Sequence, residues 1–243
     1  MREITERVTD YWTARAHDFA AVRENELKDP ISERWLAEME PFFQGKSGLR
    51  ILDAGTGTGF FAILLAGRGH EVTGIDLTPA MIDEAERLAR ENGAEPTFRV
   101  MDVQALRFAD QSFDAVVTRN LTWTLPEPEK AYAEWFRVLK PGGVLLNFDA
   151  DYAENVRNHN QKASAIDPSG AYGHFGITPE LSRENARITL EMPAAGARRP
   201  GWDLELVRRA GFTACSADLC AGKRVLRERD LADAPLFLLW ARK

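Results

Sequence analysis

The chain of 243 residues has little of what staples small secreted proteins together or holds proteins in membranes. It has only two cysteines, Cys215 and Cys220, so no disulfide framework is expected and a reducing compartment is indicated. Its apolar runs fall far short of the roughly 20 residues that cross a membrane. Its first residues lack the apolar core of a signal peptide. These absences predict a cytoplasmic protein with no membrane partner.

Positive charge is also scarce. Lys and Arg number 31 against 37 Asp and Glu, which gives a formal net charge of −6. Without a positive field to gather phosphates, nucleic acid is a disfavoured partner. The 44% hydrophobic and 28% charged residues are typical of a globular protein, and the length fits one α/β domain with an insertion. We expect a monomer or a homodimer.

What the sequence does contain is an alternation of short apolar runs with amphipathic stretches. Two helical segments are expected within residues 3–43, and the last two strands of the chain are expected to be joined by a basic turn and to pair antiparallel. The expected strands are 49–55, 70–76, 96–102, 113–120, 144–150, 212–219 and 234–242. The expected helices between them are 58–69, 78–93 with Thr78 as N-cap, 127–143 ending at Pro-Gly-Gly, and 201–212.

This alternation predicts an α/β fold, a doubly wound and mostly parallel sheet with helices on both faces. In such sheets ligands bind beyond the carboxyl ends of the strands, near the point where the strand order reverses. The glycine-rich loop at residues 55–59 directly follows the first expected strand. The loop is therefore placed at a binding site.

The same rhythm divides the chain into four parts. Residues 1–45 are a helical cap, 46–150 are the core with the glycine loop, 151–200 are an insertion, and 201–243 complete the core sheet. The insertion is polar and contains several prolines and glycines. Segments of this length without strand–helix units are usually lids or small helical subdomains. We expect residues 151–200 to cover the binding site between strands five and six.

The loop reads Asp53-Ala-Gly55-Thr-Gly57-Thr-Gly59-Phe60. Its backbone N–H groups lie at the start of a helix, where the dipole favours negative charge. A dinucleotide fingerprint needs a third glycine where Phe60 stands, because that glycine allows close packing of helix on strand. The pattern therefore weakens the case for a nicotinamide cofactor.

In this setting the loop resembles motif I of the class I S-adenosylmethionine-dependent methyltransferases. The resemblance covers roughly residues 49–148 and extends, in the family's order and spacing, to "GIDLTPAMI", Asp102-Val103, "FADQSFDAVV" and "RVLKPGGVLLNFD". It implies a Rossmann-like sheet of seven strands with an antiparallel last strand. It also implies S-adenosylmethionine as cofactor and transfer of its methyl group by in-line displacement. The acidic net charge and the length of the insertion favour a small-molecule acceptor over a macromolecule.

The resemblance gives the glycine loop a role in binding the cofactor. Gly55, Gly57 and Gly59 would let the backbone contact the ribose and the amino-acid part of the cofactor. Asp53 would order the loop and face the methionine ammonium group.

The ends of the next strands would hold the rest of the cofactor. Asp76 would accept hydrogen bonds from both ribose hydroxyls, since a carboxylate has two acceptor oxygens. Leu77 would pack on the adenine, Asp102 would accept from its N6 amine, and the Val103 N–H would donate to the ring. Asn120 would offer its carbonyl near the ammonium group.

The stretch "DYWTARAHDF" resembles a helix with which many of these enzymes close over the cofactor. Tyr11, Trp12 and Arg15 share one face of that helix. Arg15 would hold the cofactor carboxylate as a bidentate pair, with Tyr11 beside it. The alternative is a surface arginine next to core aromatics.

Two residues are candidates for a general base. His174 lies in "AYGHFG" within the insertion, where the alternative is an exposed loop histidine. Asp149, at the carboxyl end of the fifth strand, faces the pocket by topology, and the alternative is a strand-end acid with satisfied hydrogen bonds. Positioning can suffice for methyl transfer, so a base is not required. No metal is expected.

Other roles remain open at this point. Trp123 is either a wall of the acceptor pocket or a buried structural tryptophan, and Arg198 with Arg199 either anchors an acidic acceptor or is solvated. Two further functions are alternatives: an NAD(P)-dependent oxidoreductase, and a non-catalytic S-adenosylmethionine-binding protein. Calorimetry with NAD(H) and S-adenosylhomocysteine separates the first from a methyltransferase, and an acceptor panel separates the second.

Overall fold

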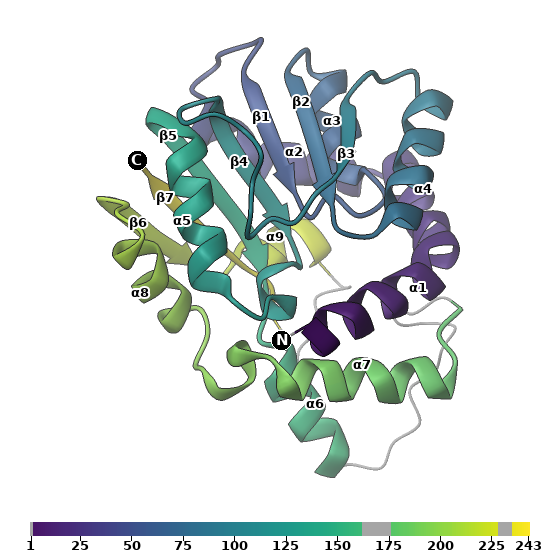
Figure 1. The fold of residues 1–243 in the computed structure, drawn as a ribbon. Coiled ribbons are helices and arrows are strands. Elements are labelled where there is room, and N and C mark those ends of the chain that lie inside the picture. Colours follow the sequence, from purple (N-terminus) through teal and green to yellow (C-terminus); the bar gives the residue numbers. More distant parts are fainter. Residues whose placement is uncertain (1, 162–175, 228–234) are drawn as a thin grey trace.

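A seven-stranded sheet in the order β3-β2-β1-β4-β5-β7-β6 runs through the molecule (Figure 1). The computed structural model describes residues 2–161, 176–227 and 235–243. The strands are β1 (Arg50–Ala54), β2 (Glu71–Asp76), β3 (Thr97–Val100), β4 (Phe113–Arg119), β5 (Leu139–Asp149), β6 (Ala214–Asp218) and β7 (Phe237–Arg242). The strand count and the α/β class agree with the prediction from the sequence.

The helices of the described residues are α1 (Arg2–Lys28), α2 (Ile31–Phe43), α3 (Phe60–Gly67), α4 (Pro79–Glu91), α5 (Pro128–Val138), α6 (Tyr152–Gln161), α7 (Pro179–Glu191), α8 (Gly201–Arg209) and α9 (Ala221–Leu226). Two short 3₁₀ turns are η1 (Thr122–Thr124) and η2 (Pro193–Gly196). None of these helices is long and apolar enough to cross a membrane.

The order of the strands reverses at β1, which pairs in parallel with both β2 and β4. Asp53 in β1 lies opposite Gly74 of β2 and Val117 of β4. The carboxyl ends of these three strands therefore meet at the switch point, where ligands bind in doubly wound sheets. At the other side of the sheet, β7 runs antiparallel between β5 and β6, as expected for the last strand.

Helices cover both faces of the sheet. On one face α2, α3 and α9 pack on apolar side chains of β1, β4, β5 and the start of β7, and the rings of Trp35, Phe61 and Phe148 meet edge to face with centroids 5.1–5.7 Å apart. On the other face lie α5 and α8. No helix joins β3 to β4, and the connecting loop covers that face with Met101, Val103 and Leu106.

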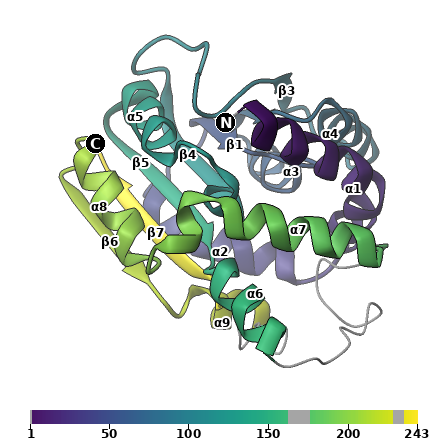
Figure 2. The same ribbon diagram turned by 60° about the horizontal axis from the view of Figure 1, so that its bottom comes forward.

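Two helices far apart in the sequence, α1 and α7, lie side by side across the carboxyl edge of the sheet (Figures 1 and 2). Arg7 of α1 forms ion pairs of 2.7 Å with Glu184 and Glu191 of α7. Tyr11 packs with Ile188 beneath these pairs. Together α1 and α7 form a roof over the switch point.

The structure differs from the expected elements in three respects. Helix α5 ends at Val138, and β5 begins at once and includes the Lys-Pro-Gly-Gly turn that was expected to end the helix, because Leu139 already pairs with Phe113 before a bulge. Helix α9 lies between β6 and β7, where only a turn was expected. Thr78 precedes α4 as predicted, but its side chain makes no capping hydrogen bond.

Candidate cofactor and acceptor site

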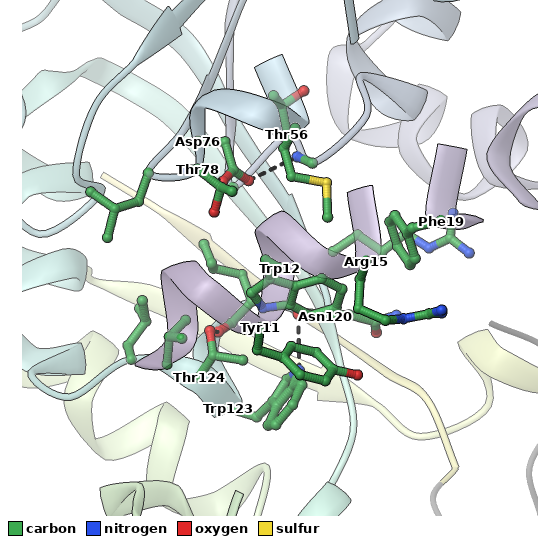
Figure 3. Close-up of a pocket in the computed structure, with 18 of the residues that line it drawn as sticks. Tyr11, Trp12, Arg15, Phe19, Thr56, Asp76, Thr78, Asn120, Trp123 and Thr124 are labelled. Atoms are coloured by element: carbon green, nitrogen blue, oxygen red, sulfur yellow. Dashed lines mark hydrogen bonds between the residues drawn. The ribbon is translucent and has the colours of Figure 1, made fainter. Parts of the chain in front are cut away.

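A cavity of about 510 Å³ lies between the carboxyl edge of the sheet and the roof helices α1 and α7 (Figure 3). Ten of the thirteen residues proposed from the sequence as cofactor-binding or catalytic line it: Tyr11, Arg15, Asp53, Gly55, Gly57, Asp76, Leu77, Asp102, Val103 and Asn120. Gly59 and Asp149 do not line it, and His174 lies outside the described residues. The fold thus brings most of the predicted site together.

The loop between β1 and α3 presents bare backbone to the cavity. Gly55 has φ = 68°, and a Cβ atom there would lie 2.7 Å from Leu121 Cδ1, so only glycine fits without a shift. The carboxylate of Asp53 orders the loop, as predicted: its Oδ2 accepts from Thr56 Oγ1 at 2.6 Å and from the Ala62 N–H at 3.0 Å. Burial raises the pKa of Asp53 to about 7.

Gly59 does not contact the cavity, which corrects the role assigned to it. Its φ is 84°, and a Cβ atom would lie 2.9 Å from Phe98 Cζ and 3.1 Å from Ala85 Cβ. The third glycine of the motif therefore allows α3 to start against β3 and α4. This is the packing role that the last glycine has in a dinucleotide fingerprint.

Asp76 ends β2 with its carboxylate at the cavity wall (Figure 3). Its Oδ2 accepts from the Gly57 N–H at 3.0 Å, and its Oδ1 accepts from the Thr78 N–H at 2.9 Å. Burial raises the pKa of Asp76, and these two backbone donors oppose the shift. Asp76 lines the cavity, and the two oxygens of a carboxylate suit two vicinal hydroxyls.

The segment after β3 forms the next part of the wall. Asp102 and Val103 line the cavity, and Asp102 Oδ1 accepts from the Gln104 backbone N–H at 2.8 Å. Gln104 also lines the cavity, and its Oε1 accepts from the Glu127 N–H at 2.8 Å. No sequence signal singled out Gln104, because its importance depends on the conformation of a loop.

Asn120 follows β4 with a left-handed φ of 55°. Its backbone carbonyl accepts from the indole Nε1 of Trp123 at 2.9 Å, so this carbonyl is already in use. Its side-chain Oδ1 is buried and has no hydrogen-bond partner. A buried carbonyl oxygen without a donor is costly, and a ligand N–H can satisfy it. The Asn120 side chain is thus the group that fits an ammonium ligand.

The roof contributes Tyr11 and Arg15 from α1, which lie beside Trp12 (Figure 3). Arg15 is 1% exposed, which excludes the surface alternative. The Tyr11 hydroxyl lies beside the Arg15 guanidinium: burial raises the pKa of Tyr11 and this cation opposes the rise. The predicted pair is therefore present at the wall of the cavity.

Arg119, Glu26 and Arg23 form a buried charge cluster that no sequence pattern indicates. Arg119, at the end of β4, pairs with Glu26 of α1 at 3.1 Å, and Glu26 pairs with Arg23. The Arg119 guanidinium lies 4.3 Å from the centroid of the Trp35 ring. Both arginines line the cavity, and the cluster fixes the C-terminal half of α1 to the sheet. Only the fold brings residues 93 positions apart together.

The structure removes Asp149 from the reacting groups. It is fully buried, its Oδ2 accepts from the Thr122 hydroxyl and the Trp123 N–H, and it pairs with Arg199 at 3.2 Å. Asp149 does not line the cavity. Arg199 is likewise buried and paired with Asp149 and Asp203, so it does not anchor an acceptor, whereas Arg198 is exposed.

The far end of the cavity is formed by η1, α6 and α7. Its lining residues are Trp123, Thr124, Tyr152, Val156, Ser182, Asn185, Ala186 and Thr189. None of these described residues carries a formal charge. We call this part the acceptor end. Trp123 is 7% exposed and meets Tyr152 with ring centroids 5.0 Å apart, so it is a wall as well as a buried tryptophan.

Within the described residues no group of His, Cys, Asp and Glu side chains is arranged to hold a metal ion. His17 and His70 do not line the cavity. The helical residues of α7 were missed at the sequence level because their pattern is that of any amphipathic helix. Their contribution depends on where the insertion packs.

Comparison with known proteins identifies the class. Residues 52–147 match the family model described as "Methyltransferase domain". Ubiquinone biosynthesis O-methyltransferase of Paracidovorax citrulli is 30% identical over 173 residues, which cover 70% of this chain and 68% of that protein. The chain belongs to the class I S-adenosylmethionine-dependent methyltransferases, whose cofactor is S-adenosylmethionine. This membership sets aside the NAD(P)-dependent oxidoreductase.

Two further relatives show how much of the sequence and of the fold this chain shares with known proteins. Demethylmenaquinone methyltransferase of Thermus thermophilus is 41% identical over 115 residues, and the chain spans only 52% of its length. Phosphoethanolamine N-methyltransferase 2 of Haemonchus contortus, solved in complex with S-adenosyl-L-methionine, superposes with a TM-score of 0.61 at 21% identity, covering 86% of this chain and 51% of that chain. The structural likeness shows the fold, and the family model covers residues 52–147 of this chain.

Proposed function

We propose that this protein transfers the methyl group of S-adenosylmethionine to an uncharged small-molecule acceptor. The observation that carries the proposal is one cavity that contains the Gly55–Gly57 backbone, the Asp76 carboxylate and the acceptor end under one roof. Acceptors named for the relatives, such as demethylmenaquinone and ubiquinone precursors, are small molecules. This agrees with an enclosed cavity of this size.

The residues present fit the cofactor. The Gly55 and Gly57 backbone lies bare at the cavity wall, Asp76 presents its carboxylate there to the ribose hydroxyls, and the partnerless Asn120 Oδ1 suits the ammonium group. Leu77, Asp102 and Val103 would hold the adenine, and Arg15 the carboxylate. When bound, S-adenosylmethionine supplies an activated methyl group on a sulfonium whose loss leaves a neutral thioether.

The residues of this chain then align the reactants and exclude water. The roof helices α1 and α7 close the cavity over the strand ends, and Trp12 and Trp123 supply flat apolar surface. Alignment in a water-excluded site is worth several powers of ten in rate. The acceptor end offers hydroxyl and amide groups, including Ser182 and Asn185, for orienting an acceptor.

Charge favours a neutral acceptor over an ionic one. The arginines and acids that line the cavity lie on α1, on the strands β1, β2 and β4, and on the loop after β3: Arg15, Arg23, Asp53, Asp76, Arg119 and Asp102. The acceptor end presents no charged side chain within the described residues. Burying an unpaired charge there would cost several kcal/mol or more. A phenolic or hydroquinone acceptor meets these conditions, and His174 remains the candidate base for its proton.

The other expectations stay part of the proposal. Residues 1–45 and 151–200 serve as cap and lid on the core formed by 46–150 and 201–243. A cytoplasmic location, the absence of a nucleic-acid partner, and a monomeric or homodimeric state remain predictions from the sequence.

Calorimetry and turnover together test the function. S-adenosylhomocysteine and S-adenosylmethionine should bind and NADH should not. A panel of phenols, hydroquinones, amines and thiols is then screened for acceptor-dependent formation of S-adenosylhomocysteine, and turnover is expected among the neutral phenols and hydroquinones. Turnover only with charged amines would overturn the acceptor class. Tight cofactor binding without turnover of any acceptor would instead support the non-catalytic alternative.

A further inference from the structure

Behind η1, on the side away from the cavity, lies a buried network of side chains that the methyl-transfer proposal does not use. At its centre Arg199, with a side chain 1% exposed, donates from Nη2 to Thr122 Oγ1 at 2.6 Å and to Asp149 Oδ2 at 3.2 Å. Its Nε and Nη2 also donate to the two carboxylate oxygens of Asp203 at 2.9 and 2.8 Å. The guanidinium therefore joins the end of the insertion to β5, α8 and η1.

The Thr122 hydroxyl uses its full hydrogen-bonding capacity in this network. It donates to Asp149 Oδ2 at 2.5 Å, and it accepts from Arg199 Nη2 and from Asn147 Nδ2 at 3.2 Å. A hydroxyl has one donor and two acceptor lone pairs. An apolar side chain of the same shape would take one hydrogen bond away from each of three buried groups, Asp149, Arg199 and Asn147.

The network also reaches Trp123, the residue after Thr122 in the chain. Asp149 Oδ2 also accepts from the Trp123 backbone N–H at 3.1 Å. On the cavity side the Trp123 indole donates to the Asn120 carbonyl at 2.9 Å, and its ring meets Tyr152. The backbone of Trp123 is thus fixed from behind η1 and its ring is fixed from the front.

Stability alone is a weak reason for such an arrangement. One arginine between two buried carboxylates carries a desolvation penalty that well-packed apolar residues would avoid. What the ionic groups add is direction, because the planar guanidinium fork fixes several partners at once. One of those partners, Thr122, belongs to η1, which frames the acceptor end.

We propose that Thr122, Asp149 and Arg199 are positioning residues that hold Trp123 in one orientation as a wall of the acceptor end. They act through Trp123 and touch neither cofactor nor acceptor. The inference rests on the proposed function for the meaning of the acceptor end, but the placement of Trp123 is measurable without any acceptor.

Fluorine NMR of protein labelled with 5-fluorotryptophan tests this placement. The Trp123 signal is assigned by its absence from Trp123→Phe. In Thr122→Val, which keeps the shape of the side chain and loses the hydroxyl, the Trp123 signal should shift or split while the other tryptophan signals stay in place. Thr122→Ser keeps the hydroxyl and should restore the Trp123 signal.

A second pair of variants keeps the test independent of Thr122→Val folding. Arg199→Lys keeps the charge and loses the fork, so it should also move the Trp123 signal, whereas Arg198→Lys at the exposed neighbour should not. A Trp123 signal that is unmoved in folded Arg199→Lys, or in folded Thr122→Val, overturns the proposal. So does a signal that Thr122→Ser fails to restore.

Calorimetry with S-adenosylhomocysteine separates this inference from the proposed function. Its affinity should be unchanged in Thr122→Val and Arg199→Lys, because neither side chain lines the cavity. Equal loss of affinity in both variants would show a general defect of the fold and would overturn the positioning role. Failure of wild-type protein to bind the nucleoside would refute the proposed function alone, since the Trp123 signal still reports on its placement.

Discussion

The backbone N–H of Gly57 donates to Asp76 Oδ2 at 3.0 Å, which ties the glycine loop after β1 to the carboxyl end of β2. Asp76 therefore has two tasks: it holds the loop in shape, and it presents acceptor sites to the cavity. Substitutions at this position affect both, so binding and folding must be measured side by side.

Asp76→Ala should weaken the binding of S-adenosylhomocysteine by about 2–3 kcal/mol, because two ribose hydroxyls lose their acceptor. Calorimetry measures the change. Asp83→Ala, which removes an exposed acid from the adjacent helix α4, is the matched control and should bind as the wild type does. Unchanged affinity in folded Asp76→Ala would show that the ribose binds elsewhere.

Arg15→Gln should weaken the binding of S-adenosylhomocysteine by about 1.5–3 kcal/mol, the usual value of a hydrogen bond to a charged group. It should leave methylthioadenosine, which lacks the amino-acid part, almost unaffected. Asp76→Ala, in contrast, should weaken both ligands. If Arg15→Gln weakens both ligands equally, Arg15 supports the shape of the roof and does not contact the carboxylate.

Gly59→Ala should destabilise the fold by about 1–3 kcal/mol, because a methyl group at a positive φ meets Phe98 and Ala85. Gly67→Ala, at the end of the same helix and with open space around it, is the control. It should be neutral or stabilising by about 0.5–1 kcal/mol. Urea unfolding compares the two, and equal free energies of unfolding would disprove the packing role of Gly59.

Asp53 should make the stability depend on pH. Burial raises its pKa from 3.8 to about 7, so between these values the folded protein holds a proton that the unfolded chain releases. The free energy of unfolding contributed by Asp53 therefore falls as the pH rises from about 4 to about 7. Asp53→Asn should flatten this part of the stability profile, as measured by urea unfolding across the range. A profile that keeps its full slope in the variant would assign the dependence to other groups.

Binding gives Asp53 a second readout. An ammonium group close to its carboxylate favours the charged form, so S-adenosylhomocysteine should release a proton from the protein near pH 7. Calorimetry in two buffers of different ionisation enthalpy detects the release, which Asp53→Asn should abolish. Absence of proton release in the wild type would place the ammonium group away from Asp53.

The sequence was sufficient to predict the sheet and to bring ten of the thirteen proposed site residues around one cavity. Those features depend on local signals: periodicity sets strands and helices, and Asp53, Asp76 and Asp102 each follow from a position at a strand end. Gly59 was assigned to the wrong task because spacing alone does not distinguish a glycine that admits a ligand from one that admits Phe98.

Local sequence signals did not predict the acceptor end or the buried groups behind it. Asp149 was a candidate general base because it ends a strand at the binding edge. Its partner Arg199 lies 50 positions away in a segment without periodic signals. The ion pair of Arg119 with Glu26 and the place of α7 beside α1 are likewise long-range contacts. Such contacts are decided by how the cap and insertion pack, which local patterns do not encode.

The position of β7 bears on how the chain is made. Because β7 lies between β5 and β6, neither of these strands can pair with β7 until residues 237–242 have left the ribosome. Until then the edge of β5 is unpaired and β6 has no sheet to join, although every other strand has already been synthesised. Long-range pairing of this kind slows folding and exposes strand edges to other chains. Shortening the chain by its last strand should therefore yield aggregates during synthesis, even though each residue that lines the cavity would still be present.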